Sequence, residues 1–231
     1  NVSALYNKGL ALNQIKKYTD AVTCFEELLV INPKDAQAFN NKGIAMAEMG
    51  NIQDASECYD KAIAADPKYA ASYFNKGVLL DKLQEHEEAL VSLEKAITID
   101  PRKQNVLVYK GIVLGKMKRH EEALNCFQNI CKKYPNNQDA FFQKGVQLAE
   151  LGEHKKALDV FDDILRKFKD NVNVIYAKSR SKAALDMYPE ALELLKQAVS
   201  KNPKIIRVWA KEEKIFEKLH GNEQFRKLVK L

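Results

Sequence analysis

The feature that most constrains the fold is a period of 34 that recurs through the chain. Glycine keeps this period at Gly9, Gly43, Gly77, Gly111 and Gly145, and Ser179 holds the next position. Alanine keeps it at Ala21, Ala55, Ala89, Ala123, Ala157 and Ala191, and proline at Pro33, Pro67, Pro101, Pro135 and Pro203, with Lys169 in the one gap. A period near 34 indicates a stacked helix–turn–helix unit. We therefore predict an all-α chain.

Each repeated position has a physical role in a pair of helices. In the second copy, the apolar spacing predicts one helix over 36–49 and another over 53–65, and Gly50 and Asn51 between them are a stop and a start signal. Glycine disfavours a helix interior by about 1 kcal/mol relative to alanine. Its recurrence inside the first helix, as at Gly43, therefore indicates that the paired helix approaches closely there.

Large side chains and lysines recur with the same period. One set of core positions holds Phe25, Tyr59, Leu93, Phe127, Phe161 and Leu195. Lysine recurs beside the glycine position, at Lys8, Lys42, Lys76, Lys110, Lys144 and Lys178. We interpret each lysine stem as packed between helices with its amine in water; an anion-binding stripe is the alternative.

These positions resemble the tetratricopeptide repeat family over residues 2–203. The six copies are 2–35, 36–69, 70–103, 104–137, 138–171 and 172–205. The resemblance implies a right-handed superhelical α-solenoid of antiparallel helix pairs, in which first helices line a concave groove and second helices form the convex back.

Two segments depart from the regular pattern. Residues 206–231 are expected to form a C-terminal capping helix or partial seventh repeat, with a first helix over 206–219, because Trp209 lies one full period after Ile175. The sixth copy, which has Ser179 and is preceded by Lys169, is expected to pack more loosely.

The resemblance implies that partners are peptides or protein segments bound in the groove. The candidate peptide-binding residues on the first helices are Tyr6, Asn7, Asn40, Asn41, Phe74, Asn75, Val78, Tyr109, Ile112, Phe142, Gln143, Tyr176 and Arg180. Asn7, Asn41 and Asn75 form an amide ladder that can both donate to and accept from an extended peptide backbone, and the aromatic residues supply contact area. The alternative is that both residue types are ordinary features of the family.

Other partner classes are expected to be absent. A subset of the family clamps chaperone C-terminal carboxylates with Lys, Asn and Arg at fixed positions of three successive first helices. Here each set of three first helices offers one match, such as Asn41 or Asn75, or none.

Residues 1–100 hold 10 basic and 15 acidic side chains, and residues 101–231 hold 27 basic and 16 acidic ones. Because many of the cations are at helix ends and the aromatics are in the core, we expect no nucleic acid partner. We expect an acidic protein or salt-dependent self-association instead.

No catalytic residue, cofactor or metal site is expected. His86, His120 and His154 share a position that Tyr18 and Ile52 occupy in other copies, so we interpret them as packing residues. There is no run of 18 apolar residues, and no membrane span or secretory signal is expected, although a lost leader stays open because the chain begins at Asn1. The four cysteines are repeat-spaced or isolated, which favours a reducing, cytoplasmic location.

Two alternatives to a peptide-binding scaffold stay open. The amide ladder also resembles the repeat array of O-linked N-acetylglucosamine transferases, so the chain could be the substrate-recruiting portion of a larger enzyme. The opposite charges of its two halves also suit a self-associating structural array.

Overall fold

The computed structural model describes residues 2–230, and these residues form helices without any strand. In chain order the helices are α1 (Val2–Gln14), α2 (Tyr18–Ile31), α3 (Ala36–Glu48), α4 (Ile52–Ala65), α5 (Ala70–Lys82), α6 (His86–Ile99), α7 (Gln104–Lys116), α8 (His120–Lys133), α9 (Gln138–Glu150), α10 (His154–Lys167), α11 (Val172–Ala184), α12 (Tyr188–Lys201), α13 (Pro203–Glu212), the 3₁₀ helix η1 (Lys214–Leu219) and α14 (Glu223–Val229). The all-α prediction is confirmed.

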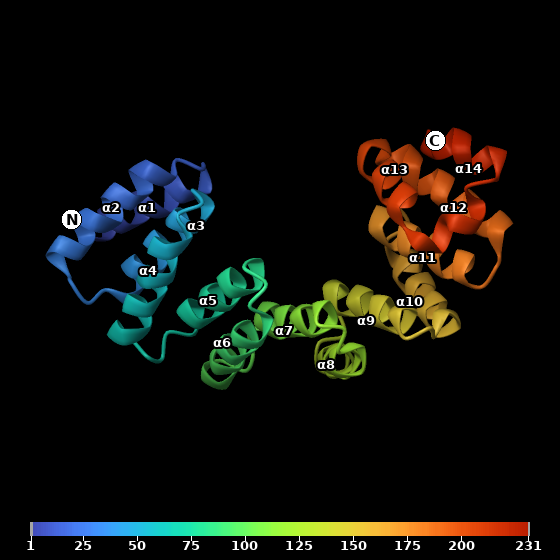
Figure 1. Cartoon of the computed structure of the whole chain (residues 1–231). Helices are drawn as coiled ribbons and strands as arrows, with labels where there is room; N and C mark the ends of the chain where they lie inside the picture. Colours follow the sequence, from blue (N-terminus) through green and yellow to red (C-terminus); the bar gives the residue numbers. More distant parts are fainter. Residues whose placement is uncertain (1, 231) are drawn as a thin grey trace. The chain divides into compact units, whose positions relative to one another are not determined.

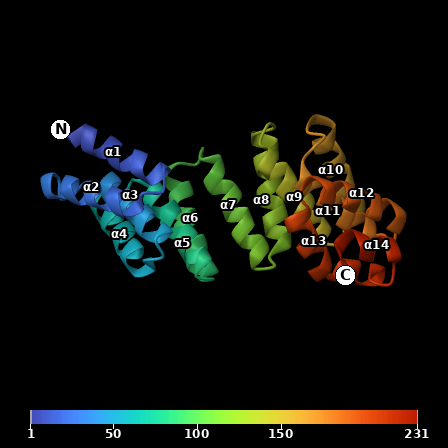
Figure 2. The same ribbon diagram turned by 90° about the horizontal axis from the view of Figure 1, so that it is seen from above.

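The chain divides into two compact units, residues 1–113 and residues 114–231, and the division lies inside α7. In the first unit α1 packs on α2, α3 on α4 and α5 on α6, and α2 also contacts α3 as α4 contacts α5. In the second unit α9 packs on α10 and α11 on α12 in the same way. Figures 1 and 2 show these consecutive antiparallel pairs, which are the building block that the period predicts.

The repeated glycines lie where first and second helices touch. A Cβ atom added to Gly9 would lie 2.8 Å from the ring of Phe25, and one added to Gly43 would lie 2.7 Å from the ring of Tyr59. A Cβ atom added to Gly145 would lie closer still to the Phe161 ring, well inside the distance at which non-bonded carbon atoms touch. The predicted close approach at the glycine position is therefore confirmed.

The lysines that recur beside the glycine position join neighbouring repeats by ion pairs. The Nζ atom of Lys42 lies 2.7 Å from Glu26 Oε1, Lys76 pairs with Asp60 at 2.5 Å and Lys110 with Glu94 at 2.8 Å. Lys178 pairs with Asp162 in the same register. The four amines that we expected in water are therefore also ion-paired, because a carboxylate on the preceding second helix reaches each of them.

The sixth copy is not loosely packed, contrary to expectation. The Ser179 side chain is fully buried, and its Oγ donates to the carbonyl oxygen of Ala191 at 2.9 Å. Val174, Ile175 and Tyr176 on the same helix are buried as well. A hydroxyl therefore fits the position that glycine holds in the other copies, because it gains a hydrogen bond to the facing helix.

The C-terminal segment differs from the single first helix expected over 206–219. Pro203 is the first residue of α13, with Asn202 as its N-cap, so α13 begins three residues before the repeat register. Proline suits that position because its missing N–H is not needed there. Helix α13 ends at Glu212, and η1 and α14 follow. Both α13 and α14 pack against α12 (Figures 1 and 2). Phe216 on η1 and Phe225 on α14 are fully buried.

Candidate functional site

The first helices of the first unit meet through side chains on successive repeats. Asn41 Nδ2 donates to the Tyr6 hydroxyl at 3.1 Å, and Asn75 Nδ2 donates to Asn40 Oδ1 at 2.8 Å. These contacts link α1 to α3 and α3 to α5. The structure thus brings four of the candidate residues together in pairs between neighbouring first helices.

The amide ladder is partly engaged within the chain. Asn41 Nδ2 also donates to the carbonyl oxygen of Gln37 at 2.8 Å, so its amide donors serve internal contacts. Asn40 is 3% exposed, Asn41 and Asn75 are half-buried, and Asn7 is exposed. An approaching peptide could therefore donate a hydrogen bond to the side-chain oxygen of Asn41. The buried Asn40 would not contact the peptide and would only orient the amide of Asn75.

A buried carboxylate on α5 makes the next contact between first helices, with a tyrosine on α7. Asp81 on α5 is 3% exposed, and its Oδ2 accepts from the Tyr109 hydroxyl at 2.6 Å. Its Oδ1 lies 3.0 Å from His86 Nδ1. Burial, the hydrogen bond to Asp81 and the charge of that carboxylate raise the pKa of Tyr109. The Tyr109 ring also packs edge-on against Phe74, with centroids 5.8 Å apart.

Sequence reasoning overlooked Asp81. It is the only acidic residue at its repeat position, which holds Asn13, Ala47, Gly115, Ala149 and Ala183 in the other copies. A lone charge in a position that is otherwise neutral was the available signal. Val78 and Ile112, the remaining candidates of this unit, are half-buried on α5 and α7.

The second unit contains a hollow of about 490 Å³, which we call the inner hollow. It lies between α9, α11 and α13 and is lined by Phe142, Val146, Asn173, Tyr176, Ala177, Arg180, Trp209, Glu212 and Glu213. Phe142, Tyr176 and Arg180 are candidate residues that the structure brings together here. Gln143, the fourth candidate of this unit, is half-buried and does not line the hollow.

Charged groups surround one side of the inner hollow. Arg180 Nη2 lies 3.2 Å from Glu150 Oε1 and 3.1 Å from Glu213 Oε1, so one guanidinium joins α9 to the end of α13 through α11. Burial, followed by the charge of Glu213, raises the pKa of Tyr176, and Arg180 opposes this rise. Burial and the charge of Arg180 lower the pKa of His154, which lies in an adjoining depression.

Trp209 lines this hollow, although its place in the repeat predicts a core residue. The register places it in the core position of Ile175, which is 3% exposed, yet Trp209 is 43% exposed. Its ring lies 5.5 Å from that of Tyr176, centroid to centroid. The early start of α13 at Pro203 accompanies this change, since it breaks the register on which the prediction depended.

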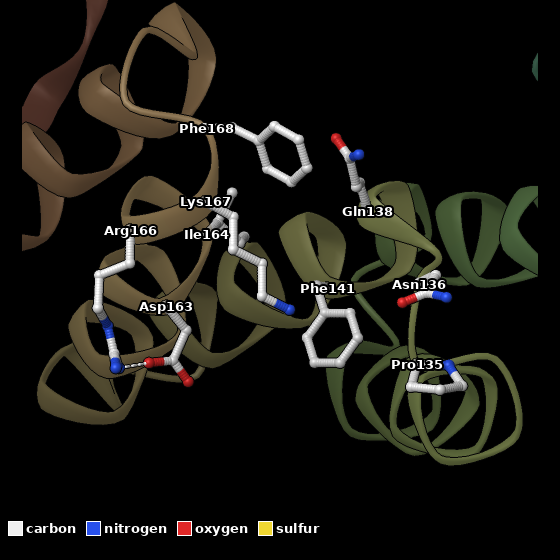
Figure 3. Close-up of a pocket in the computed structure, with 9 residues that line it drawn as sticks. All are labelled: Pro135, Asn136, Gln138, Phe141, Asp163, Ile164, Arg166, Lys167 and Phe168. Atoms are coloured by element: carbon white, nitrogen blue, oxygen red, sulfur yellow. Dashed lines mark hydrogen bonds and ion pairs between the residues drawn. The ribbon is translucent and has the colours of Figure 1, made fainter.

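A second hollow in this unit, of about 480 Å³, lies beside the turn between α8 and α9. Pro135, Phe141, Ile164 and Phe168 supply its apolar walls, and Figure 3 shows Lys167 extending toward the Phe141 ring. Arg166 pairs with Asp163 at its rim (Figure 3). None of these residues is a sequence candidate, because their repeat positions are core positions, turns or helix ends rather than the predicted inner face.

Comparison with known families decides what kind of chain this is. The sequence matches the family profile described as tetratricopeptide repeat over residues 40–103 and 110–172, which is more than half of the chain, and a second profile, TPR repeat, over residues 9–50. The chain belongs to the tetratricopeptide repeat family. The predicted family and its helix-pair fold are thus confirmed.

Several solved tetratricopeptide structures resemble this chain. YrrB, described as a TPR protein with an unusual peptide-binding site, is 25% identical, with a TM-score of 0.63 over 82% of this chain and 98% of that one. The pilF protein of Pseudomonas aeruginosa is 21% identical, with a TM-score of 0.76 over 92% of this chain and 97% of that one. A tetratricopeptide repeat protein from Parabacteroides merdae is 14% identical, with a TM-score of 0.74 over 99% and 97%. A comparison with curated proteins gave no match.

Membership in the tetratricopeptide family makes the chain a scaffold for protein interaction in general terms, in a family that is typically non-enzymatic. Among residues 2–230, no three His, Cys, Asp or Glu side chains gather closely enough to hold a metal ion. Nor does any helix in this range have the length and apolar character needed to cross a bilayer.

Proposed function

We propose that this tetratricopeptide protein binds a peptide or protein segment along the inner faces of its first helices. In the first unit the ligand would lie over Asn7, Tyr6, Asn41, Phe74 and Asn75. In the second unit one ligand side chain would enter the inner hollow. The observation that carries the proposal is this hollow, because it gathers three of the residues that the sequence singled out around a partly exposed tryptophan.

The composition of the inner hollow suits a ligand side chain. Small-molecule and side-chain pockets are typically concave, mostly apolar and supplied with a few polar groups that set orientation. Here Phe142, Tyr176 and Trp209 form aromatic walls, and Arg180 and Glu213 supply charge. Trp and Tyr are also residue types that dominate binding energy at interfaces, and the Trp209 ring is exposed here.

The comparison with solved structures supports the same proposal. YrrB is described as having a peptide-binding site, and it matches this chain over almost all of its own length. Since both chains share the helix-pair fold, a peptide is the ligand class with the best support for this one.

Selection from a random peptide library tests the proposal. The full chain is used to enrich binders, and binding of the enriched peptides is then measured for Asn173→Arg, which places a long side chain at an exposed position of the inner hollow. Asn129→Arg, at an exposed position on α8, is the matched control. The proposal predicts loss of binding in the first variant alone. Peptides that bind both variants as well as the unaltered chain would contradict it.

A further inference from the structure

We infer that the inner hollow selects a cationic side chain, lysine or arginine, from the bound ligand. This inference rests on the proposed function and adds the chemistry of the ligand residue. Its basis is the combination of aromatic rings and excess carboxylate around one hollow.

The aromatic part of the site is formed by Tyr176 and Trp209, with Phe142 as a third wall. The Tyr176 and Trp209 rings are 5.5 Å apart at an interplanar angle of 50°, so they enclose a corner rather than a flat stack. The faces of aromatic rings attract cations, and tryptophan does so most strongly. Because Trp209 is 43% exposed, an entering side chain can reach its ring.

The charges around the hollow are unbalanced toward acid. Arg180 is the one cation among the lining residues, and it already contacts both Glu150 and Glu213. Glu212 also lines the hollow and is exposed, and it forms no ion pair with another residue of 2–230. Two carboxylates and one guanidinium therefore line the hollow, and the guanidinium is shared with a third carboxylate, Glu150, in the adjoining depression, which leaves a local negative excess.

This acidic excess is specific to the hollow and not a property of the surrounding surface. Residues 101–231 hold 27 basic and 16 acidic side chains, so most of the surface near the hollow is basic. An anionic ligand group would be repelled by the excess carboxylate, since Arg180 is already engaged. A neutral apolar group would cover Glu212 without compensating its charge, which is unfavourable. A cationic side chain would be attracted both to the faces of the aromatic rings and to the excess carboxylate.

Nuclear magnetic resonance of Trp209 tests the inference without a known ligand. The chain has one tryptophan, so its indole N–H gives a single assigned signal. The probes are N-acetyl-lysine methylamide and N-acetyl-norleucine methylamide, which differ in the terminal amine. We expect the lysine probe to shift the indole signal saturably and the norleucine probe to bind at least several-fold more weakly.

Matched charge variants make the test specific to the hollow. Glu212→Gln should weaken binding of the lysine probe by about two- to fivefold, the range for one partly exposed charge pair. Glu193→Gln, at an exposed position on α12, should leave it unchanged. Equal binding of the two probes, no shift with either probe, or an unchanged affinity in Glu212→Gln would overturn the inference.

Failure of the cation site can be distinguished from failure of the proposed peptide binding. Library peptides that Asn173→Arg rejects, but that show no preference for lysine or arginine, would leave peptide binding standing and refute the cation site alone. Library peptides insensitive to Asn173→Arg would instead refute the proposed function.

Discussion

The packing of Gly145 against Phe161 shows how tightly single residues are constrained in this chain. The Phe161 ring is fully buried, and it occupies the space that a methyl group at position 145 would need. At Gly9 and Gly43 the same space is filled by Phe25 and Tyr59. The recurrence of glycine is therefore a consequence of the ring on the facing helix, and the helix-propensity cost is offset by that contact.

We predict that Gly145→Ala destabilises the second unit. Alanine gains about 1 kcal/mol in helix propensity, but forcing a methyl into a packed core costs roughly 1–3 kcal/mol. A net loss of up to about 2 kcal/mol is expected from urea unfolding. Gly221→Ala is the control, because an added Cβ there meets nothing within 4 Å. A Gly145→Ala variant more stable than the unaltered chain would refute the steric explanation.

Two residues of the candidate site show where sequence reasoning stopped. Asn41 and Asn75 were predicted from their spacing to face a ligand, but the spacing could not reveal that their amide donors serve Tyr6 and Asn40. Such contacts depend on rotamers and on the neighbouring helix, neither of which is encoded in a repeat position. Whether these residues bind a ligand stays a prediction.

At the scale of elements, the repeat period predicts the helix pairs well. The second copy was expected to have helices over 36–49 and 53–65, and the structure has Ala36–Glu48 and Ile52–Ala65. The C-terminal segment was predicted less well, because Pro203 begins α13 directly after Asn202 instead of lying in a longer turn. The inner hollow depends on that irregular segment, so a repeat pattern alone could not predict Trp209 or Glu213 as lining residues.

The ion pairs between neighbouring helices are also an element-scale feature, and one of them is missing. The lysines at the repeated position that pair with a carboxylate on the preceding second helix are Lys42, Lys76, Lys110 and Lys178. The residue at the corresponding position before Lys144 is Gln128. Gln128 and Lys144 line a common depression in the second unit. The amide in place of a carboxylate leaves this link between α8 and α9 without an ion pair.

We predict that Gln128→Glu strengthens the link. An ion pair at a partly exposed position contributes about 0.2–1 kcal/mol, so the urea midpoint of the second unit should rise slightly. The gain should shrink in high salt, which screens exposed charges. Glu94→Gln, which removes the equivalent pair with Lys110, should lower the stability of the first unit by a similar amount. An unchanged or lower midpoint in Gln128→Glu would contradict the prediction.

At the scale of the whole molecule, tyrosines with raised pKa values make the stability of both units depend on pH in the alkaline range. Burial is the main cause that raises the pKa of Tyr59, Tyr109 and Tyr176 above the usual value near 10. A group whose pKa is raised in the folded state favours its protonated form there. The stability it contributes is therefore complete below the unfolded pKa and is lost as the pH rises toward the folded value.

We predict that both units lose stability above a pH of about 10. The part of the tyrosinate absorbance that comes from these three of the nine tyrosines should change together with the far-ultraviolet circular dichroism, because their ionisation accompanies unfolding. In Tyr59→Phe, the alkaline loss in the first unit should be smaller, since one raised pKa is removed. Tyrosine titration that is complete while the helical signal is intact would show that these rings ionise in the folded chain.

The most direct test of peptide binding at the inner face is the fluorescence of Trp209, the one tryptophan of the chain. A peptide enriched from the random library is titrated into the full chain while the emission maximum is recorded, and binding is followed independently by a label on the peptide. If a ligand side chain enters the inner hollow, the emission should shift to shorter wavelength and saturate at the affinity reported by the label, because the ring is 43% exposed before binding. A labelled peptide that binds fully while the Trp209 emission stays unchanged would place the ligand elsewhere and contradict the account.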